Sequence, residues 1–207
     1  MKSFHLVGSV LLILLAAAGC STVAPRDMSL FFEHQPMSVL VLPPINHSSD
    51  IDASYDMLAM CTQPLCELGY YVYPVAVVDR VMKENGVAIP DEMHGLPLDK
   101  LGDVFGADAV LYMVIERYGS KYLVFASQVE VAVRASLVDV RTGQVLWDGS
   151  AHRVESGSSG LIEALVEQVL NQLTDQVHQV GRMAVAELFY SGSTGIPVGH
   201  RFPKTEP

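Results

Sequence analysis

Apolar and polar positions divide the chain into two halves with different spacing. In the first half, short apolar runs alternate with stretches of helical period. The predicted elements are strands at Ser38–Leu42 and Tyr70–Tyr73, a helix at Ala53–Leu68, and a helix opened by Pro74 and closed near Asn85. The Ser38–Leu42 run is unbroken, which is typical of a central strand covered on both faces. This order predicts a parallel α/β unit with right-handed crossovers.

The second half follows an irregular stretch, Val87–Pro97. A short helix near Leu98–Phe105 leads into a strand at Ala109–Ile115. Apolar residues then alternate between Val129 and Leu137, which predicts a half-buried strand of period two. A tight reversal at Asp139–Gln144 returns the chain as an antiparallel meander. The predicted fold class is therefore α/β, with a three-layer mixed sheet flanked by helices.

A long helix is predicted near the C-terminus, after a small-residue loop at Glu155–Gly160. Its apolar residues recur at steps of three and four: Ile162, Val166, Val169, Leu173, Val177, Val180, Ala184 and Leu188. We interpret this stripe as covering one face of the sheet, and a coiled-coil surface for a partner is the alternative. Gly181 interrupts the stripe and predicts a kink or break. The Gly/Pro-rich segment Ser191–Pro207 cannot continue the helix, so it is either disordered or an extended arm that docks.

The N-terminus has the pattern of an export leader. Lys2 supplies a positive charge, and the apolar run that follows is too short for a spanning helix, which needs about 20 residues. Small residues then precede Cys20, and this pattern resembles the bacterial lipobox, although Ala17 stands where Leu is usual. Cys20 is therefore predicted to be the first mature residue and the lipidation site, carrying palmitate and other acyl chains. An ordinary secretory cleavage near Ala18 is the alternative.

The leader divides the chain into four parts. Residues 1–19 are the lipoprotein signal peptide, 20–36 the lipid anchor and tether, 37–190 a single α/β domain, and 191–207 the tail. Ser21 at the second mature position resembles the enterobacterial signal for outer-membrane sorting. We expect a lipid-anchored protein of the outer membrane that faces the periplasm.

Charge and cysteine usage limit the function classes. The chain carries 23 Asp and Glu against 13 Lys and Arg, without a basic cluster, so nucleic-acid binding is not expected. Cys61 and Cys66 lie five residues apart on a predicted helix, beyond the reach of a disulfide unless Pro64 breaks the helix. We favour two small, mostly buried thiols, although an oxidising periplasm keeps the disulfide open.

The sequence shows no set of residues arranged for catalysis. We therefore expect that the protein is not an enzyme and that it holds no cofactor or metal ion. His47, Asp50 and Asp52 form a weak candidate ligand site, because they share one loop at the expected carboxyl end of the first strand. Helix capping by Asp52 or Ser54 explains part of the same pattern. Trp147 is interpreted as a core anchor. The remaining histidines are interpreted as surface or edge residues: His34, His94, His152, His178 and His200.

Several blocks together resemble a known family of bacterial lipoproteins. The most specific are Cys61–Leu65 and Gly69–Pro74, supported by Val39–Pro44, Ala107–Tyr112 and the Val138–Trp147 hairpin. The family includes a neisserial surface lipoprotein antigen, and the resemblance covers nearly the whole mature chain. This family is similar in fold to the N-terminal domain of TolB and more distantly to CsgG, LpoB and PelC.

The resemblance implies a protein that acts by binding, in secretion, polymer export or envelope maintenance. It implies no cofactor or catalytic residue, and it makes a CsgG-like lipoprotein the first partner to test. The leading hypothesis is a non-catalytic accessory or scaffold subunit that binds envelope proteins and itself. The alternatives are a small-ligand or peptidoglycan-binding module around His47–Asp52 and a periplasmic hydrolase.

Overall fold

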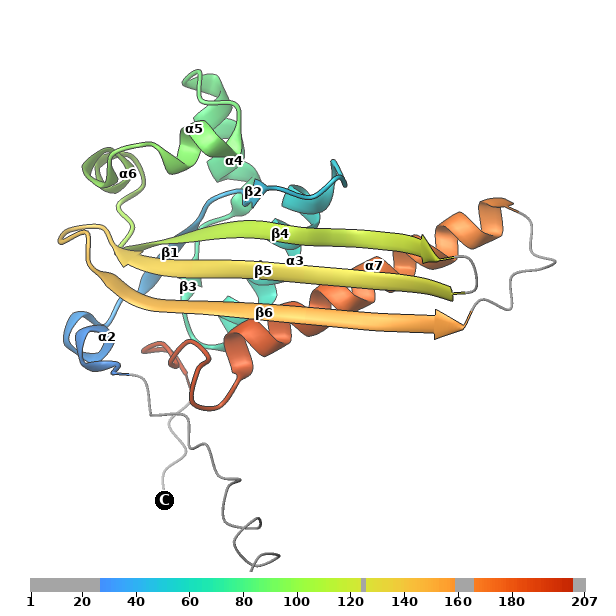
Figure 1. Ribbon diagram of the computed structural model, residues 1–207. Coiled ribbons are helices and arrows are strands. Elements are labelled where there is room, and N and C mark those ends of the chain that lie inside the picture. The colour runs from blue at the N-terminus through green and yellow to red at the C-terminus, as the bar shows by residue number, and fades with distance from the viewer. Residues whose placement is uncertain (1–26, 124–125, 159–165, 203–207) are drawn as a thin grey trace, which may run out of the picture.

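A six-stranded mixed sheet is the centre of the fold in the computed structural model, which describes residues 27–123, 126–158 and 166–202. The strand order is β3-β1-β4-β5-β6, with the short β2 beside β4 (Figure 1). Helices flank this sheet, so the predicted mixed-sheet α/β class is confirmed. Among the described residues, no helix has the length and apolarity needed to cross a bilayer.

The N-terminal half forms the predicted parallel unit. Strand β1 (Ser38–Val41) pairs in parallel with β3 (Tyr71–Val72) and with β4 (Ala109–Leu123). The predicted helices are present as α3 (Ala53–Glu67), α4 (Val75–Glu84) and α6 (Leu98–Phe105). The stretch predicted to be irregular instead contains α5 (Pro90–His94). Its signals were Pro90 in the first turn and two acidic residues after it, which favour a helix N-terminus.

The meander is longer than its apolar pattern indicated. Strand β5 (Ala126–Asp139) pairs antiparallel with β4 and with β6 (Val145–Ser158) along its whole length. Residues 116–123 and 155–158, which the sequence did not assign to strands, therefore belong to them. Backbone pairing with β5 supplies their hydrogen bonds, although their side chains show no regular apolar alternation. Gly143 adopts φ of +71° in the predicted reversal.

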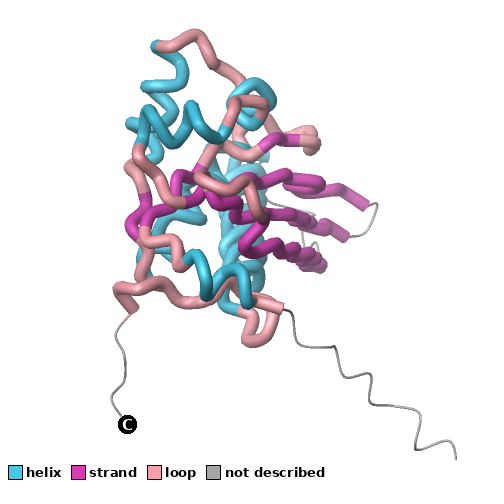
Figure 2. Tube along the Cα trace, turned by 90° about the vertical axis from the view of Figure 1, so that its left-hand side faces the viewer, coloured by secondary structure: helices cyan, strands magenta, loops and turns pink. Residues whose placement is uncertain are grey.

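Two cores lie on opposite faces of the sheet. Val39 and Val41 point to a large core shared with α3 and the C-terminal helix α7 (Val166–Tyr190). Leu40 and Leu42 point to a smaller core beneath α4, α5 and α6. The central strand is thus covered on both faces, as its unbroken run predicted. In both views α4, α5 and α6 gather at the top, while α2 and the C-terminal arm lie below (Figures 1 and 2).

Helix α7 confirms core packing for the described part of the apolar stripe. Val177, Val180 and Ala184 are at most 7% exposed. The predicted break at Gly181 is wrong, because the helix runs through it without interruption. A Cβ at Gly181 would lie 2.9 Å from Sδ of Met60, so glycine here lets α7 approach α3. Ile162 and the last two residues of the predicted loop, 159–160, lie outside the described residues.

Part of the predicted tether is folded. Residues 29–34 form α2 (Ser29–His34), whose Phe31 is 3% exposed, and His34 Nδ1 lies 2.8 Å from Oδ2 of Asp139. The folded domain therefore begins several residues before position 37. A six-residue helix is too short to show a period, which is why the sequence pattern missed it. Cys20 and the leader lie outside the described residues.

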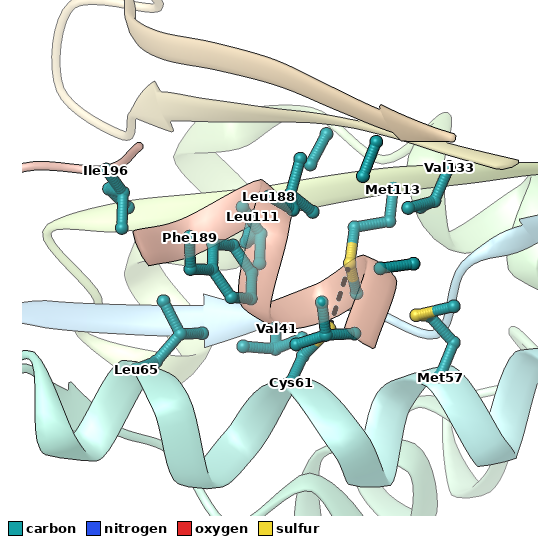
Figure 3. Close-up of a cluster of buried hydrophobic side chains, with 14 of the residues drawn as sticks. Val41, Met57, Cys61, Leu65, Leu111, Met113, Val133, Leu188, Phe189 and Ile196 are labelled. Carbon is teal, nitrogen blue, oxygen red and sulfur yellow. Dashed lines mark hydrogen bonds between the residues drawn. The ribbon is translucent and has the colours of Figure 1, made fainter. Parts of the chain in front are cut away.

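Both remaining cysteines are free thiols. Cys61 is buried on α3 and its thiol donates to Sδ of Met113 at 3.4 Å (Figure 3), and burial raises the pKa of this thiol. Cys66 is exposed, so the prediction of two buried thiols is half right. Pro64 lies inside α3 without ending it. The two thiols therefore stay on one continuous helix, which keeps them apart.

The C-terminal segment through Phe202 docks on the domain as an arm. Ile196 is 4% exposed and joins the large core. The indole Nε1 of Trp147 donates to the Thr194 carbonyl at 3.0 Å, and Gly199 N donates to the Leu68 carbonyl at 2.7 Å. Trp147 is 1% exposed, which confirms it as a core anchor.

Candidate functional site

The loop predicted as a ligand site follows β2 (Ile45–Asn46) and is held by the side chain of Asn46. Its Nδ2 donates to the Asp50 carbonyl at 2.6 Å, and its Oδ1 accepts from Ser48 N at 2.9 Å and Ser48 Oγ at 2.7 Å. Asp50 Oδ1 in turn accepts from Asp52 N at 3.0 Å. The loop is therefore shaped mainly by its own short polar side chains.

The predicted capping of α3 is only partly correct. Asp52 occupies the N-cap position but makes no side-chain cap bond. Ser54 does not cap either, because its Oγ donates to the Pro44 carbonyl at 2.7 Å. That bond ties the start of α3 to the residue that precedes β2, so it joins the two ends of the loop.

One open hollow, here called the outer hollow, has a volume of about 510 Å³. It is lined by His47, Ser48, Ser49, Asp50, Glu116, Arg117, Tyr118, Gly119, Ser120, Lys121 and Glu130. Glu116 and Glu130 already have basic neighbours. Glu116 accepts from Nε of Arg134 at 3.0 Å, and Glu130 pairs with Lys121 at 3.3 Å and with His152 at 3.1 Å.

These ion pairs set the charge of the outer hollow. The hydrogen bond from Arg134 lowers the pKa of Glu116, and that from His152 lowers the pKa of Glu130. Both carboxyls therefore stay ionised well into the acidic range. His47 lies 3.7 Å from Glu116, with 56% of its side chain exposed. Mixed charges that are already paired suit adhesion to a polar partner rather than proton transfer.

A second hollow, here called the helix-side hollow, lies where α3, β4 and α7 meet and has a volume of about 470 Å³. It is lined by Asp50, Asp52, Tyr55, Asp56, Tyr118, Gly119, Ser120, Thr174, Val177 and His178. Asp56 Oδ2 lies at its centre, accepting from the Tyr118 hydroxyl at 3.0 Å and facing His178 Nε2 at 2.9 Å. Burial, then the Asp56 carboxylate, raises the pKa of Tyr118, so this phenol stays protonated.

The structure distributes the three predicted residues over both hollows. Asp50 borders both, His47 lines only the outer hollow, and Asp52 only the helix-side hollow. They do not converge on one point, and among the described residues no group of three or more His, Cys, Asp or Glu is placed to hold a metal ion. Sequence reasoning missed Asp56, Tyr118 and His178, because three distant elements bring them together.

A β-bulge places Tyr118 in this site. The register of β4 against β5 shifts between Ile115 and Arg117, so Glu116 is an extra residue. Ile115 and Tyr118, three residues apart, are consequently both buried on the α7 side. The apolar pattern of the sequence does not predict this change in the direction of the side chains along β4.

Three of the single histidines are more than surface residues. His34 pairs with the buried Asp139, and His178 with Asp56. His94 is half-buried, its Nε2 lies 3.0 Å from the Pro43 carbonyl, and burial lowers its pKa. Each was assigned to a surface or edge because its partner lies far away along the chain.

Comparison with known proteins places this chain in a family. Residues 26–201 match the family described as "Putative lipoprotein GNA1162-like". The chain belongs to this GNA1162-like family. A relative, the lipoprotein NMB1124/NMB1162 of Neisseria meningitidis serogroup B, is 39% identical over 98% of each chain. The resemblance inferred from the sequence blocks is thereby confirmed.

Solved structures extend the comparison of the fold. The crystal structure of lipoprotein GNA1162 from Neisseria meningitidis is 43% identical, with a TM-score of 0.57 over 68% of this chain and 99% of that one. A PelC dodecamer from Paraburkholderia phytofirmans is 18% identical, with a TM-score of 0.46 over 73% of this chain and 87% of that one. The LpoB C-terminal domain from Salmonella enterica is 19% identical, with a TM-score of 0.39 over 61% and 93%. The last two are too distant to inform function.

Proposed function

We propose that this protein is an outer-membrane lipoprotein, anchored through Cys20 and facing the periplasm, that serves as a non-catalytic accessory or scaffold subunit. The assembly it serves is one of envelope secretion, export or maintenance. The observation that carries the proposal is membership of a lipoprotein family over residues 26–201, together with the leader-like sequence pattern that precedes Cys20. The anchor restricts the domain to the membrane surface, where only membrane-bound or periplasmic partners meet it.

The described geometry supports action by binding. Three carboxylates that line the two hollows are engaged by neighbours: Glu116 by Arg134, Glu130 by Lys121 and Asp56 by His178. Such pairs hold a surface in one shape without presenting a reactive group. The hollows adjoin each other along β4, where Tyr118, Gly119 and Ser120 line both of them.

Crosslinking in intact cells tests this function. Cells that produce the natural protein are treated with a membrane-permeable amine crosslinker, and captured proteins are identified by mass spectrometry. We expect repeated capture of one or more envelope proteins, and a CsgG-like lipoprotein is the first to look for. Cys20→Ser serves as the control, because an unanchored chain should lose these partners. Recovery of only the uncrosslinked monomer from intact envelopes would overturn the proposal.

A small-ligand or peptidoglycan-binding module is the second candidate. The observation that favours it is the volume of the hollows, about 470 and 510 Å³, which lies within the usual range of ligand sites. Soluble muropeptides titrated into isotope-labelled protein should then shift the amide signals of Ser48, Ser49 and Asp50. Unchanged spectra at millimolar muropeptide would remove this candidate.

A further inference from the structure

One edge of β4 loses its strand partner halfway along its length. Strand β2 pairs with β4 only at Val114 and Ile115, and the last bond on that side runs from His47 N to the Ile115 carbonyl at 2.9 Å. The chain then turns away through 48–52 into α3. Strand β4 continues to Leu123, and beyond Ile115 its only strand partner in the described residues is β5.

The open edge, residues 117–121, runs between the two hollows. Tyr118, Gly119 and Ser120 line both of them. The Tyr118 side chain points to the helix-side hollow, where it contacts Asp56, and Lys121 points to the opposite face, where it contacts Glu130. Successive side chains of a strand point to opposite faces of its sheet. A strand added here would therefore place alternate side chains in the outer and helix-side hollows.

The charge of the helix-side hollow favours one kind of side chain. Asp50, Asp52 and Asp56 line it, His178 pairs with Asp56, and Arg182 is the one cation that acts on Tyr118 among the described residues. Lysine and arginine have long apolar stems and cationic ends, which suit a hollow that combines these carboxylates with the rings of Tyr55 and Tyr118. Ser48 and Ser49 in the outer hollow suit smaller polar side chains.

We propose that the 117–121 edge of β4 binds a partner's extended segment by strand addition, and that this segment carries Lys or Arg at alternate positions. The basic side chains enter the helix-side hollow, and main-chain hydrogen bonds to β4 supply the sequence-independent part of the affinity. The inference rests on the proposed function, because it names the chemical class of partner that an accessory subunit would recruit.

Charge argues against a second copy of this chain as the occupant. An unpaired edge is also a template for self-association. The chain has a formal net charge of −10, and antiparallel pairing of two β4 edges would bring together two sets of Asp50, Asp52 and Asp56. Repulsion between them opposes self-pairing, whereas the same carboxylates attract a basic segment.

Backbone-methylated peptides give the most direct test. The probe is a fluorescein-labelled decapeptide of alternating Thr and Lys, titrated by fluorescence anisotropy against the full mature protein in detergent. Two isomers carry N-methyl groups on alternate residues, one set on the Lys residues and the other on the Thr residues. Both isomers keep the charge of the parent peptide, but each blocks only one of its hydrogen-bonding edges.

We expect the parent and one isomer to bind and the other isomer to bind at least tenfold more weakly. Hydrogen exchange should slow at amides within 117–121 when the parent peptide binds. Equal binding by both isomers would mean simple charge attraction and would overturn the proposal. Absence of parent binding, or sedimentation showing dimers paired through β4, would also overturn it.

Two double variants that each remove two negative charges distinguish the effect of the helix-side hollow on peptide binding from the effect of the net charge. Asp50→Asn with Asp52→Asn keeps side-chain size and oxygen acceptors but removes two charges from the site. We expect about fivefold weaker peptide binding at low salt, the effect of two partly exposed charges. Asp99→Asn with Asp103→Asn removes two exposed charges from α6 and should leave binding unchanged. Equal losses in both pairs would contradict recognition by the hollow. Partner capture in cells does not depend on this peptide, so the two proposals can fail separately.

Discussion

At the scale of single residues, Asp139 shows how a turn and a distant helix are joined. Its Oδ1 accepts from Thr142 N at 2.7 Å and from Thr142 Oγ1 at 2.9 Å, while Oδ2 faces His34 Nδ1 at 2.8 Å. The Asp139 side chain is 9% exposed. A carboxylate this buried needs these partners, because an unpaired buried charge is costly. The sequence predicted the turn after Asp139 but not helix α2. Asp139 holds both of them in place.

The pH dependence of this contact is predictable. Burial raises the pKa of Asp139, but hydrogen bonds from His34 and Thr142 outweigh it and hold the pKa below its ordinary value of 3.8. A depressed folded-state pKa stabilises the fold above the unfolded-state pKa, and this stabilisation is lost as the pH falls through the folded value. We expect Asp139→Asn to lower the free energy of unfolding by about 1–2 kcal/mol at pH 7.

Urea unfolding at pH 7, 5 and 3 measures this effect. The deficit of Asp139→Asn should persist at pH 5 and shrink by pH 3, because below the ordinary value of 3.8 the unfolded state takes up a proton on this carboxyl before the folded state does. Asp103→Asn, at an exposed position on α6, should match the natural protein at each pH. A deficit of the same size at all three values would show that the charge of Asp139 contributes nothing.

At the scale of elements, apolar patterning predicted what hydrophobic burial decides. The unbroken run at β1, the stripe on α7 and the alternation in β5 each correspond to a buried face. Patterning failed where backbone pairing or local chemistry decides, as in the polar half of β4, the two-residue β2 and the single turn of α5. The predicted break at Gly181 was wrong because this glycine allows a close contact between α7 and α3 and does not interrupt α7.

The candidate site was predictable only in part for the same reason. His47, Asp50 and Asp52 are close in sequence and follow a predicted strand, so the loop that carries them could be predicted as a candidate site. Asp56 and His178 are 122 positions apart and meet only after α3 and α7 have packed on the sheet. The spacing of residues within one segment cannot predict a contact between two distant segments.

The docking of the C-terminal arm leads to a prediction about stability. Ile196 is 4% exposed in the large core, whereas Val198, two residues later, is 50% exposed. We expect Ile196→Ala to lower the free energy of unfolding by about 2–4 kcal/mol, because it leaves a cavity in the large core. Val198→Ala should change it by less than about 0.5 kcal/mol. Thermal and urea unfolding of the two variants measure this, and equal stabilities would mean that the arm is not part of the fold.

At the scale of the whole molecule, the anchor and the fold lie close together along the chain. Asp27 is the first described residue and follows Cys20 by seven positions. A fully extended chain spans at most about 3.3–3.6 Å per residue, so a lipid on Cys20 would hold Asp27 within roughly 25 Å of the bilayer. The folded start at α2 therefore makes the tether shorter than the sequence alone suggested, and a domain anchored through Cys20 would reach only partners near its own membrane.

The lipid on Cys20 is the prediction on which this arrangement depends. Natural protein grown with labelled palmitate should incorporate label and fractionate with the outer membrane, because several acyl chains give durable anchoring. Cys20→Ser should lose the label and the membrane fraction together. Cys66→Ser removes the exposed thiol of α3 instead and should behave as the natural protein does. If the natural chain stays unlabelled while a known lipoprotein in the same cells is labelled, the domain is free in the periplasm. The restriction to partners at one membrane would then no longer hold.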